Sequence, residues 1–89
     1  MTALFRRRAG LTERSLAKTV FLAHPKLGAL YRLNETGSAL WRLLADPISV
    51  EEAVSVFQKA FPDDPPETID EQVRSLLDAL IEDDLVEEV

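Results

Sequence analysis

Cysteine is absent from the 89-residue chain, which excludes disulfides, thiolate metal sites and thiol nucleophiles. Histidine occurs once, at His24, so the chain alone cannot form a metal site built from histidines. No apolar run approaches the ~20 residues that a membrane-spanning helix needs. The arginines near the start are not followed by an apolar stretch, so we expect no secretory signal and a cytoplasmic protein.

The residues that usually carry enzyme chemistry are few and scattered. The three glycines lie far apart, so the sequence has no glycine-rich phosphate-binding loop. His24 is the only imidazole available to the serines, and it lies beside Pro25 in an expected turn, where we expect an exposed side chain. The acidic pairs are adjacent in sequence, and adjacent residues do not face each other on a helix. We therefore expect neither an enzyme nor a bound cofactor or metal ion.

Charge is distributed unevenly along the chain, whose formal net charge is −6. Eight basic and two acidic residues lie up to Ala45, whereas two basic and 14 acidic residues lie beyond it. This asymmetry is compatible with a nucleic-acid arm at Arg6–Arg8, with a docking surface for a charged partner, or with two halves that attract each other. Nucleic acid is the least favoured partner, because recognition helices in the acidic half would be repelled by phosphate.

Strand-forming residues dominate the first third of the chain after a basic start. Residues 1–9 contain three consecutive arginines, which are hard to bury, so we expect a flexible N-terminal arm. Residues 24–28 carry Pro and Gly, which predict a reversal of the chain. We expect Phe21 and Tyr31 to belong to the core. The expected strands are 11–16, 19–23 and 29–33.

Helical signals follow the strands. Asn34 is a good N-cap for a first helix. Ser49 with Glu52, and Thr68 with Glu71, have the spacing of capping boxes that begin a second and a third helix. The apolar stripes expected to face the core are Leu40, Trp41 and Leu44, then Ala53, Val54, Phe57 and Phe61, then Ile69, Val73, Leu76, Leu77 and Leu80.

These elements predict an α+β fold that is winged-helix-like, with a three-stranded antiparallel β-meander followed by three α-helices. We expect residues 1–9 to be the basic arm and residues 10–89 to form a single domain. A meander leaves its first and third strands as edges, and residues 29–33 are thus predicted to form an open edge.

An ordered set of residues in the middle of the chain carries a family resemblance. A strand ends in Leu33-Asn34 and is followed by Gly37, by Trp41 and by a Leu-Leu pair, in the stretch LYRLNETGSALWRLL. The stretch SVEEAV and the leucines of the last helix continue the pattern. Over residues 11–86 this set resembles the PqqD family, and the form Tyr-x-Leu-Asn-x-Thr-Gly is similar to that of stand-alone members found in lasso-peptide pathways.

The resemblance implies a non-catalytic peptide chaperone, also called a RiPP recognition element. Such a protein binds the leader segment of a ribosomally made precursor peptide and presents it to a modifying enzyme, such as a radical SAM protein or a leader peptidase. The leader adds as a strand to the third strand and lies in a groove against the third helix. The open edge predicted from the sequence suits this mode, because its unpaired backbone groups can bind an incoming strand.

The candidate peptide-binding residues come from these two elements. Arg74 and Asp78 are expected to make polar contacts, whereas Leu77 and Ile81 could equally be core residues. The full candidate set is Ala29, Leu30, Tyr31, Arg32, Leu33, Val73, Arg74, Leu77, Asp78 and Ile81.

Two other function classes remain open at this stage. The same open edge could pair with a second copy, which would make the chain a self-associating regulatory module or homodimer. A winged-helix nucleic-acid-binding protein would instead bind through Arg6–Arg8 with a strong salt dependence.

Overall fold

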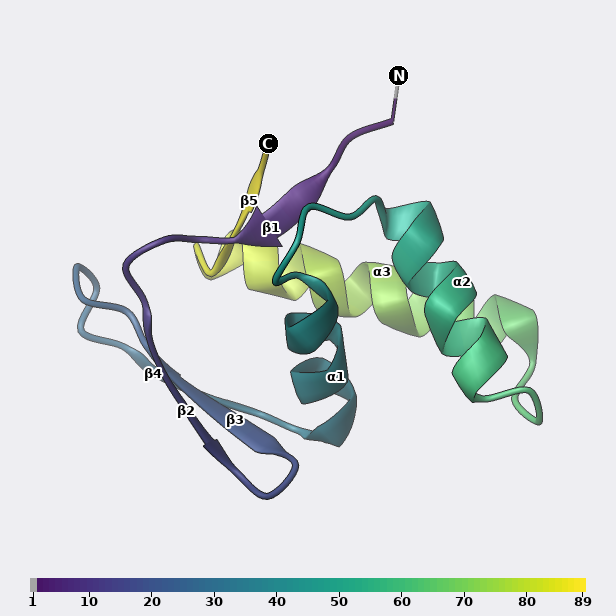
Figure 1. Ribbon diagram of the computed structural model, residues 1–89, viewed down its shortest axis with the longest axis horizontal. Coiled ribbons are helices and arrows are strands. Elements are labelled where there is room, and N and C mark those ends of the chain that lie inside the picture. The colour runs from purple at the N-terminus through teal and green to yellow at the C-terminus, as the bar shows by residue number, and fades with distance from the viewer. Residues whose placement is uncertain (1) are drawn as a thin grey trace.

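The computed structural model describes residues 2–89. A three-stranded sheet lies on one side of the molecule, α1 lies beside it, and α2 and α3 pack against each other on the far side of α1 (Figure 1). This arrangement confirms the predicted α+β fold, with a β-meander followed by three helices. The elements in order are β1 (Phe5–Arg7), β2 (Thr12–Leu16), β3 (Thr19–Ala23), β4 (Leu30–Leu33), α1 (Glu35–Leu43), α2 (Val50–Ala60), α3 (Pro66–Glu82) and β5 (Val86–Glu88).

The sheet has the order β2-β3-β4, and both of its pairings are antiparallel. Alternation along β3 turns Val20 and Leu22 toward the helices, where both are buried. Phe21 points to the opposite face and is 38% exposed, so the expectation that it belongs to the core is wrong. Tyr31 lies opposite Leu22 and packs, half-buried, against the core as expected.

Helix α1 follows β4 directly. The Asn34 side chain accepts a 2.7 Å hydrogen bond from the Gly37 amide, which confirms Asn34 as the N-cap. The stripe of Leu40, Trp41 and Leu44 is buried, each residue being 1% exposed.

Helices α2 and α3 differ in how they begin. The Glu52 amide donates to the Ser49 hydroxyl at 3.1 Å, so the first capping box is confirmed. The second is wrong, because α3 begins at Pro66 and Thr68 already lies inside its first turn. Proline is well suited to that position because a first-turn amide needs no intrahelical partner. Phe61, expected in the core, is 47% exposed beyond the end of α2 and stacks on Phe57.

The basic start of the chain is not an arm over its whole length. Within residues 1–9, Phe5–Arg7 forms β1, which pairs antiparallel with β5, so the two ends of the chain lie side by side (Figure 1). The physical reason is that each arginine finds a partner within the chain. Arg6 and Arg8 bind Glu87, Arg8 also binds Asp84, and Arg7 binds Glu13 and the Trp41 carbonyl.

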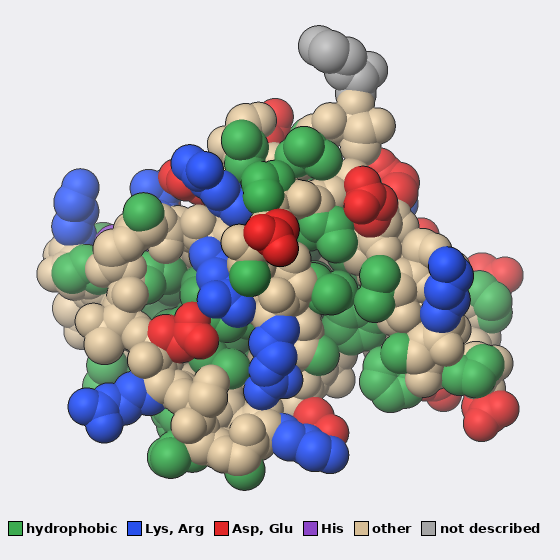
Figure 2. Space-filling view, in the orientation of Figure 1, with side chains coloured by type: hydrophobic (Ala, Val, Ile, Leu, Met, Phe, Trp, Pro, Cys, Tyr) green, Lys and Arg blue, Asp and Glu red, His purple; other side chains and the backbone are tan. Residues whose placement is uncertain are grey.

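These contacts join the basic and acidic parts of the sequence. In Figure 2, Lys and Arg side chains gather toward the sheet side of the view, whereas Asp and Glu are more frequent toward the helices.

Within residues 2–89, no helix has the length and apolar character needed to cross a membrane.

Candidate functional site

The outer edge of β4 is open. Within residues 2–89, β4 pairs with β3 alone. The His24 amide donates to the Ala29 carbonyl at 2.9 Å, and the register then places Leu22 opposite Tyr31 as the next hydrogen-bonded pair. Because such pairs alternate in an antiparallel ladder, Leu30 and Arg32 turn their N–H and C=O groups away from β3. The open edge therefore offers two donors and two acceptors to an incoming strand.

Two contacts place α3 near both ends of this edge. At one end, a Cβ on Gly37 would lie 3.5 Å from both the Leu33 Cβ and the Leu76 Cδ2, so β4, α1 and α3 meet at this glycine. At the other end, His24 at the end of β3 binds Asp84 just after α3. Four strand steps from Ala29 to Leu33 rise about 13 Å, and eight helical steps from Leu76 to Asp84 rise about 12 Å. The second half of α3 thus has the length needed to flank β4.

The candidate residues on α3 fall into two groups. Val73 and Leu77 are buried in the core. Arg74, Asp78 and Ile81, with the edge of Leu77, line a small hollow whose other walls are Phe5 and Val50. No residue of β4 lines this hollow, so the structure does not bring the Arg74 side of α3 together with the candidate strand residues.

A different flank of α3 faces β4. Leu76, which contacts the Gly37 position beside Leu33, is half-buried. Helical spacing places Gln72, Ala79 and Asp83 next to it, and all three are exposed. The apolar stripe in the sequence does not predict this flank, because it indicates only the direction of the core, whereas the neighbours of each flank depend on how α3 packs.

His24 lies at the end of the candidate site where β4 begins. The sequence predicts an exposed His24 side chain, but the structure buries it, with only 4% of the residue exposed. Its Nδ1 accepts hydrogen bonds from the Lys26 and Leu27 amides, both at 3.2 Å, so the ring proton lies on Nε2 and is donated to Asp84 Oδ2 at 3.0 Å. That hydrogen bond, with the nearby charge of Arg8, holds the pKa of the Asp84 carboxyl below its usual value. Both nitrogens of the buried His24 imidazole are therefore engaged in hydrogen bonds.

Ser38 holds the other end of β4, at Leu33. It is fully buried. Its hydroxyl accepts a hydrogen bond from the Val20 amide at 2.9 Å and donates one to the Leu33 carbonyl at 3.1 Å. The hydroxyl is thereby inserted between β3 and β4 where the ladder ends. The position of the last β4 residue is thus set by a side chain of α1.

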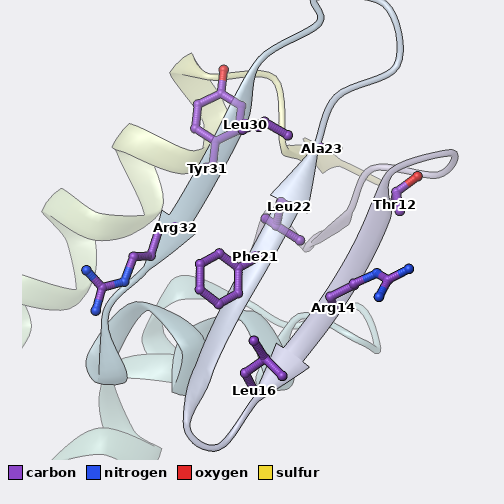
Figure 3. Close-up of a pocket in the computed structure, with 9 residues that line it drawn as sticks. All are labelled: Thr12, Arg14, Leu16, Phe21, Leu22, Ala23, Leu30, Tyr31 and Arg32. Carbon is purple, nitrogen blue, oxygen red and sulfur yellow. The ribbon is translucent and has the colours of Figure 1, made fainter.

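The face of the sheet that points away from the helices is hollowed and largely apolar. We call it the outer face; its residues are Thr12, Arg14, Leu16, Phe21, Ala23, Leu30 and Arg32. The hollow has a volume of about 430 Å³. Figure 3 shows Phe21 at its centre, between Arg14 and Arg32, with Leu16 at one end and Leu30 toward the other. Because the sequence pattern predicts Phe21 in the core, it does not predict this surface.

Comparisons with known proteins bear on this arrangement. No curated protein matches the chain significantly. A solved structure of TbiB1 in complex with the TbiA(beta) leader peptide is similar in fold, with a TM-score of 0.83 and 24% sequence identity. The match covers 92% of this chain and 94% of that chain. The family model described as coenzyme PQQ synthesis protein D matches residues 19–86, a span that includes β3, β4 and all three helices. The chain belongs to the PqqD family.

Proposed function

We propose that this protein is a non-catalytic peptide-binding protein that holds the leader segment of a ribosomally made precursor peptide and presents it to a modifying enzyme. The observation that carries the proposal is the open edge of β4 beside α3, in a chain of the PqqD family. The fold shared with TbiB1, which was solved with a leader peptide, supports it.

The backbone of β4 would supply most of the affinity. An extended peptide can pair with the outward N–H and C=O groups of Leu30 and Arg32 whatever its sequence. Its side chains would alternate between the two faces of the extended sheet. Those on the inner face would meet Tyr31, Leu33 and the Leu76 flank of α3, and those on the outer face would meet Leu30 and Arg32.

The β2 edge is open as well, but it is a poorer site. All five residues of β2 are exposed, and the hydrogen bond that ties this strand to a helix, from Trp41 to Glu13, is to α1 and not to α3. A peptide added to β2 would therefore gain backbone hydrogen bonds without a wall for its inward side chains. The α3 flank is what distinguishes the two edges and favours β4.

Proline substitution at matched positions tests the choice of edge. Leu30→Pro removes an outward donor at the β4 edge and leaves the β3–β4 hydrogen bonds in place. Ser15→Pro is the control, because the register turns the Ser15 amide outward at the β2 edge in the same way. The probes are the short precursor peptides encoded beside the gene, titrated into isotope-labelled protein and followed by amide shifts.

We expect saturable shifts along β4 and on the second half of α3, a loss of about tenfold or more in affinity for Leu30→Pro, and no loss for Ser15→Pro. Equal affinity of Leu30→Pro and the unchanged protein would contradict strand addition to β4. Concentration-dependent sedimentation without any peptide would instead support self-association through the same edge.

The presented leader would be used by a radical SAM enzyme or a leader peptidase in the cytoplasm, where ribosomal peptides are made. Such an enzyme should act faster on the precursor when this protein is present. Leu30→Pro should lose that acceleration together with leader binding.

A further inference from the structure

We propose that the outer face of the sheet is the docking surface for the modifying enzyme, and that it receives an apolar side chain of the enzyme flanked by carboxylates. This inference rests on the proposed function. It concerns a surface on the opposite side of β4 from the α3 flank.

The outer face exposes large apolar side chains around a hollow. Leu30 is 84% exposed, Leu16 is 67% exposed and Phe21 is 38% exposed. The three surround the hollow of about 430 Å³, which is large enough for one or two side chains. Contiguous exposed apolar residues of this kind are typical of binding surfaces, whereas single exposed leucines need no explanation.

The charges of this face specify the partner's chemistry. Its two charged residues, Arg14 and Arg32, are on either side of Phe21 (Figure 3), although the chain as a whole is acidic. Neither of them is among the arginines that pair with a carboxylate in residues 2–89. An enzyme surface with carboxylates beside an apolar side chain would complement both features.

Charge also argues against a second copy of this chain on the same face. A symmetric contact would bring four guanidinium groups around one hollow, because each copy contributes Arg14 and Arg32. A nucleic-acid strand is poorly matched too, because two arginines around an apolar centre neutralise few phosphates.

The outer face is continuous with the proposed leader site. A strand added to β4 would extend the sheet, and its outward side chains would lie beside Leu30 and Arg32. An enzyme seated over Phe21 would thus touch the protein and the bound leader together. Enzyme docking on this face therefore predicts tighter binding when the leader is present.

Three substitutions test the outer face without altering the β4 edge: Phe21→Ser, Leu16→Ser and Arg14→Glu. Leu16 is on an exposed strand, so its variant keeps the test informative if Phe21→Ser folds poorly. The controls are Val56→Ser and Lys59→Glu, which make matched changes at exposed positions of α2. The probes are the leader-processing enzyme and the precursor encoded beside the gene, with affinities measured separately for the leader, for the enzyme, and for the enzyme in the presence of leader.

We expect the three variants to bind the enzyme about tenfold or more weakly, with leader affinity unchanged to within about twofold and both controls unaffected. Unchanged enzyme affinity in all three variants overturns the inference, as does an unmodified protein that fails to bind the enzyme. Loss of leader affinity in Leu16→Ser or Arg14→Glu also overturns it, because the face would then belong to the leader site. If the leader fails to bind the unmodified protein, the proposed function is overturned instead. The affinity for the enzyme measured without leader then still tests the outer face by itself. Salt-sensitive binding of a single-stranded RNA probe that Arg14→Glu abolishes would assign the face to nucleic acid.

Discussion

Ser38 is the position where a small change should have the largest measurable effect on the peptide-binding edge. Its hydroxyl satisfies two backbone groups at once, the Val20 amide at 2.9 Å and the Leu33 carbonyl at 3.1 Å, and it is fully buried. Ser38→Ala removes only this oxygen. The buried Val20 donor and the partly buried Leu33 acceptor then both lose their partner.

The size of the effect follows from these contacts. Each buried backbone group left without a partner costs about 1–3 kcal/mol. Alanine recovers about 0.5 kcal/mol because it is a better helix former than serine. Partial closure of the gap between β3 and β4 reduces the penalty, so we expect a net loss of about 2 kcal/mol in the free energy of unfolding. For a domain of this size, that loss lowers the midpoint of thermal unfolding by roughly 10 °C.

Ser55→Ala is the matched control, because Ser55 lies in the middle of α2 and is exposed. It should change the free energy of unfolding by no more than about 0.5 kcal/mol, in the stabilising direction. Urea unfolding of both variants, with fluorescence of Trp41 as the signal, measures the difference. A loss below about 0.5 kcal/mol for Ser38→Ala would refute the reasoning, because it would show that the two groups pair directly once the hydroxyl is gone.

Two further predictions concern the ends of the chain. Arg7→Ala should lower the free energy of unfolding by about 1–2 kcal/mol, because Arg7 donates to the Trp41 carbonyl at 2.8 Å and lies 4.9 Å from the centre of the indole ring. Arg6→Ala on the same strand, which removes an exposed ion pair, should cost less than about 0.5 kcal/mol by the same urea assay, and equal losses would contradict this account. Asp84→Asn should lower stability at pH 7, because the pKa of Asp84 is lowered by the hydrogen bond from His24 and by Arg8. That stabilisation is present above the unfolded pKa and is lost as the pH falls through the folded pKa, so the difference in stability between the two proteins should shrink in acid. A difference that does not shrink as the pH is lowered from 7 would assign the effect to something other than the charge.

Much of the fold could be predicted from local signals. The strand expected at residues 29–33, the N-cap at Asn34 and the capping box at Ser49 each depend on signals within a few residues, and the structure confirms all three. The strand β1 could not be predicted in this way, because its partner β5 is at the other end of the chain. Three consecutive arginines indicate an exposed arm until the distant carboxylates that bind them are known.

The candidate site was predictable only in part, for the same physical reason. The position of the β4 residues of the site depends on which edge of the meander is open, and this follows from the order of the elements. Which α3 residues face β4 depends on the rotation of α3 about its own axis, and this rotation is set by packing against α1 and α2. Leu76 and Arg74 are only two positions apart on α3, yet Leu76 lies beside Leu33 whereas Arg74 lines the hollow near Phe5.

Arg32 gives the open edge a bias toward a foreign strand over a second copy. If two β4 strands paired antiparallel through Leu30 and Arg32, each Leu30 would lie opposite the other copy's Arg32, and the two Arg32 side chains would be diagonal neighbours on one face. Like charges at that distance oppose pairing, and a strand of four residues offers few hydrogen bonds to overcome the opposition. A peptide with an acidic side chain at the corresponding position reverses the sign of this interaction. The same residue therefore disfavours self-association through β4 and does not oppose a foreign strand without a positive charge at that position, so the edge can stay open without being occupied by another copy of the protein.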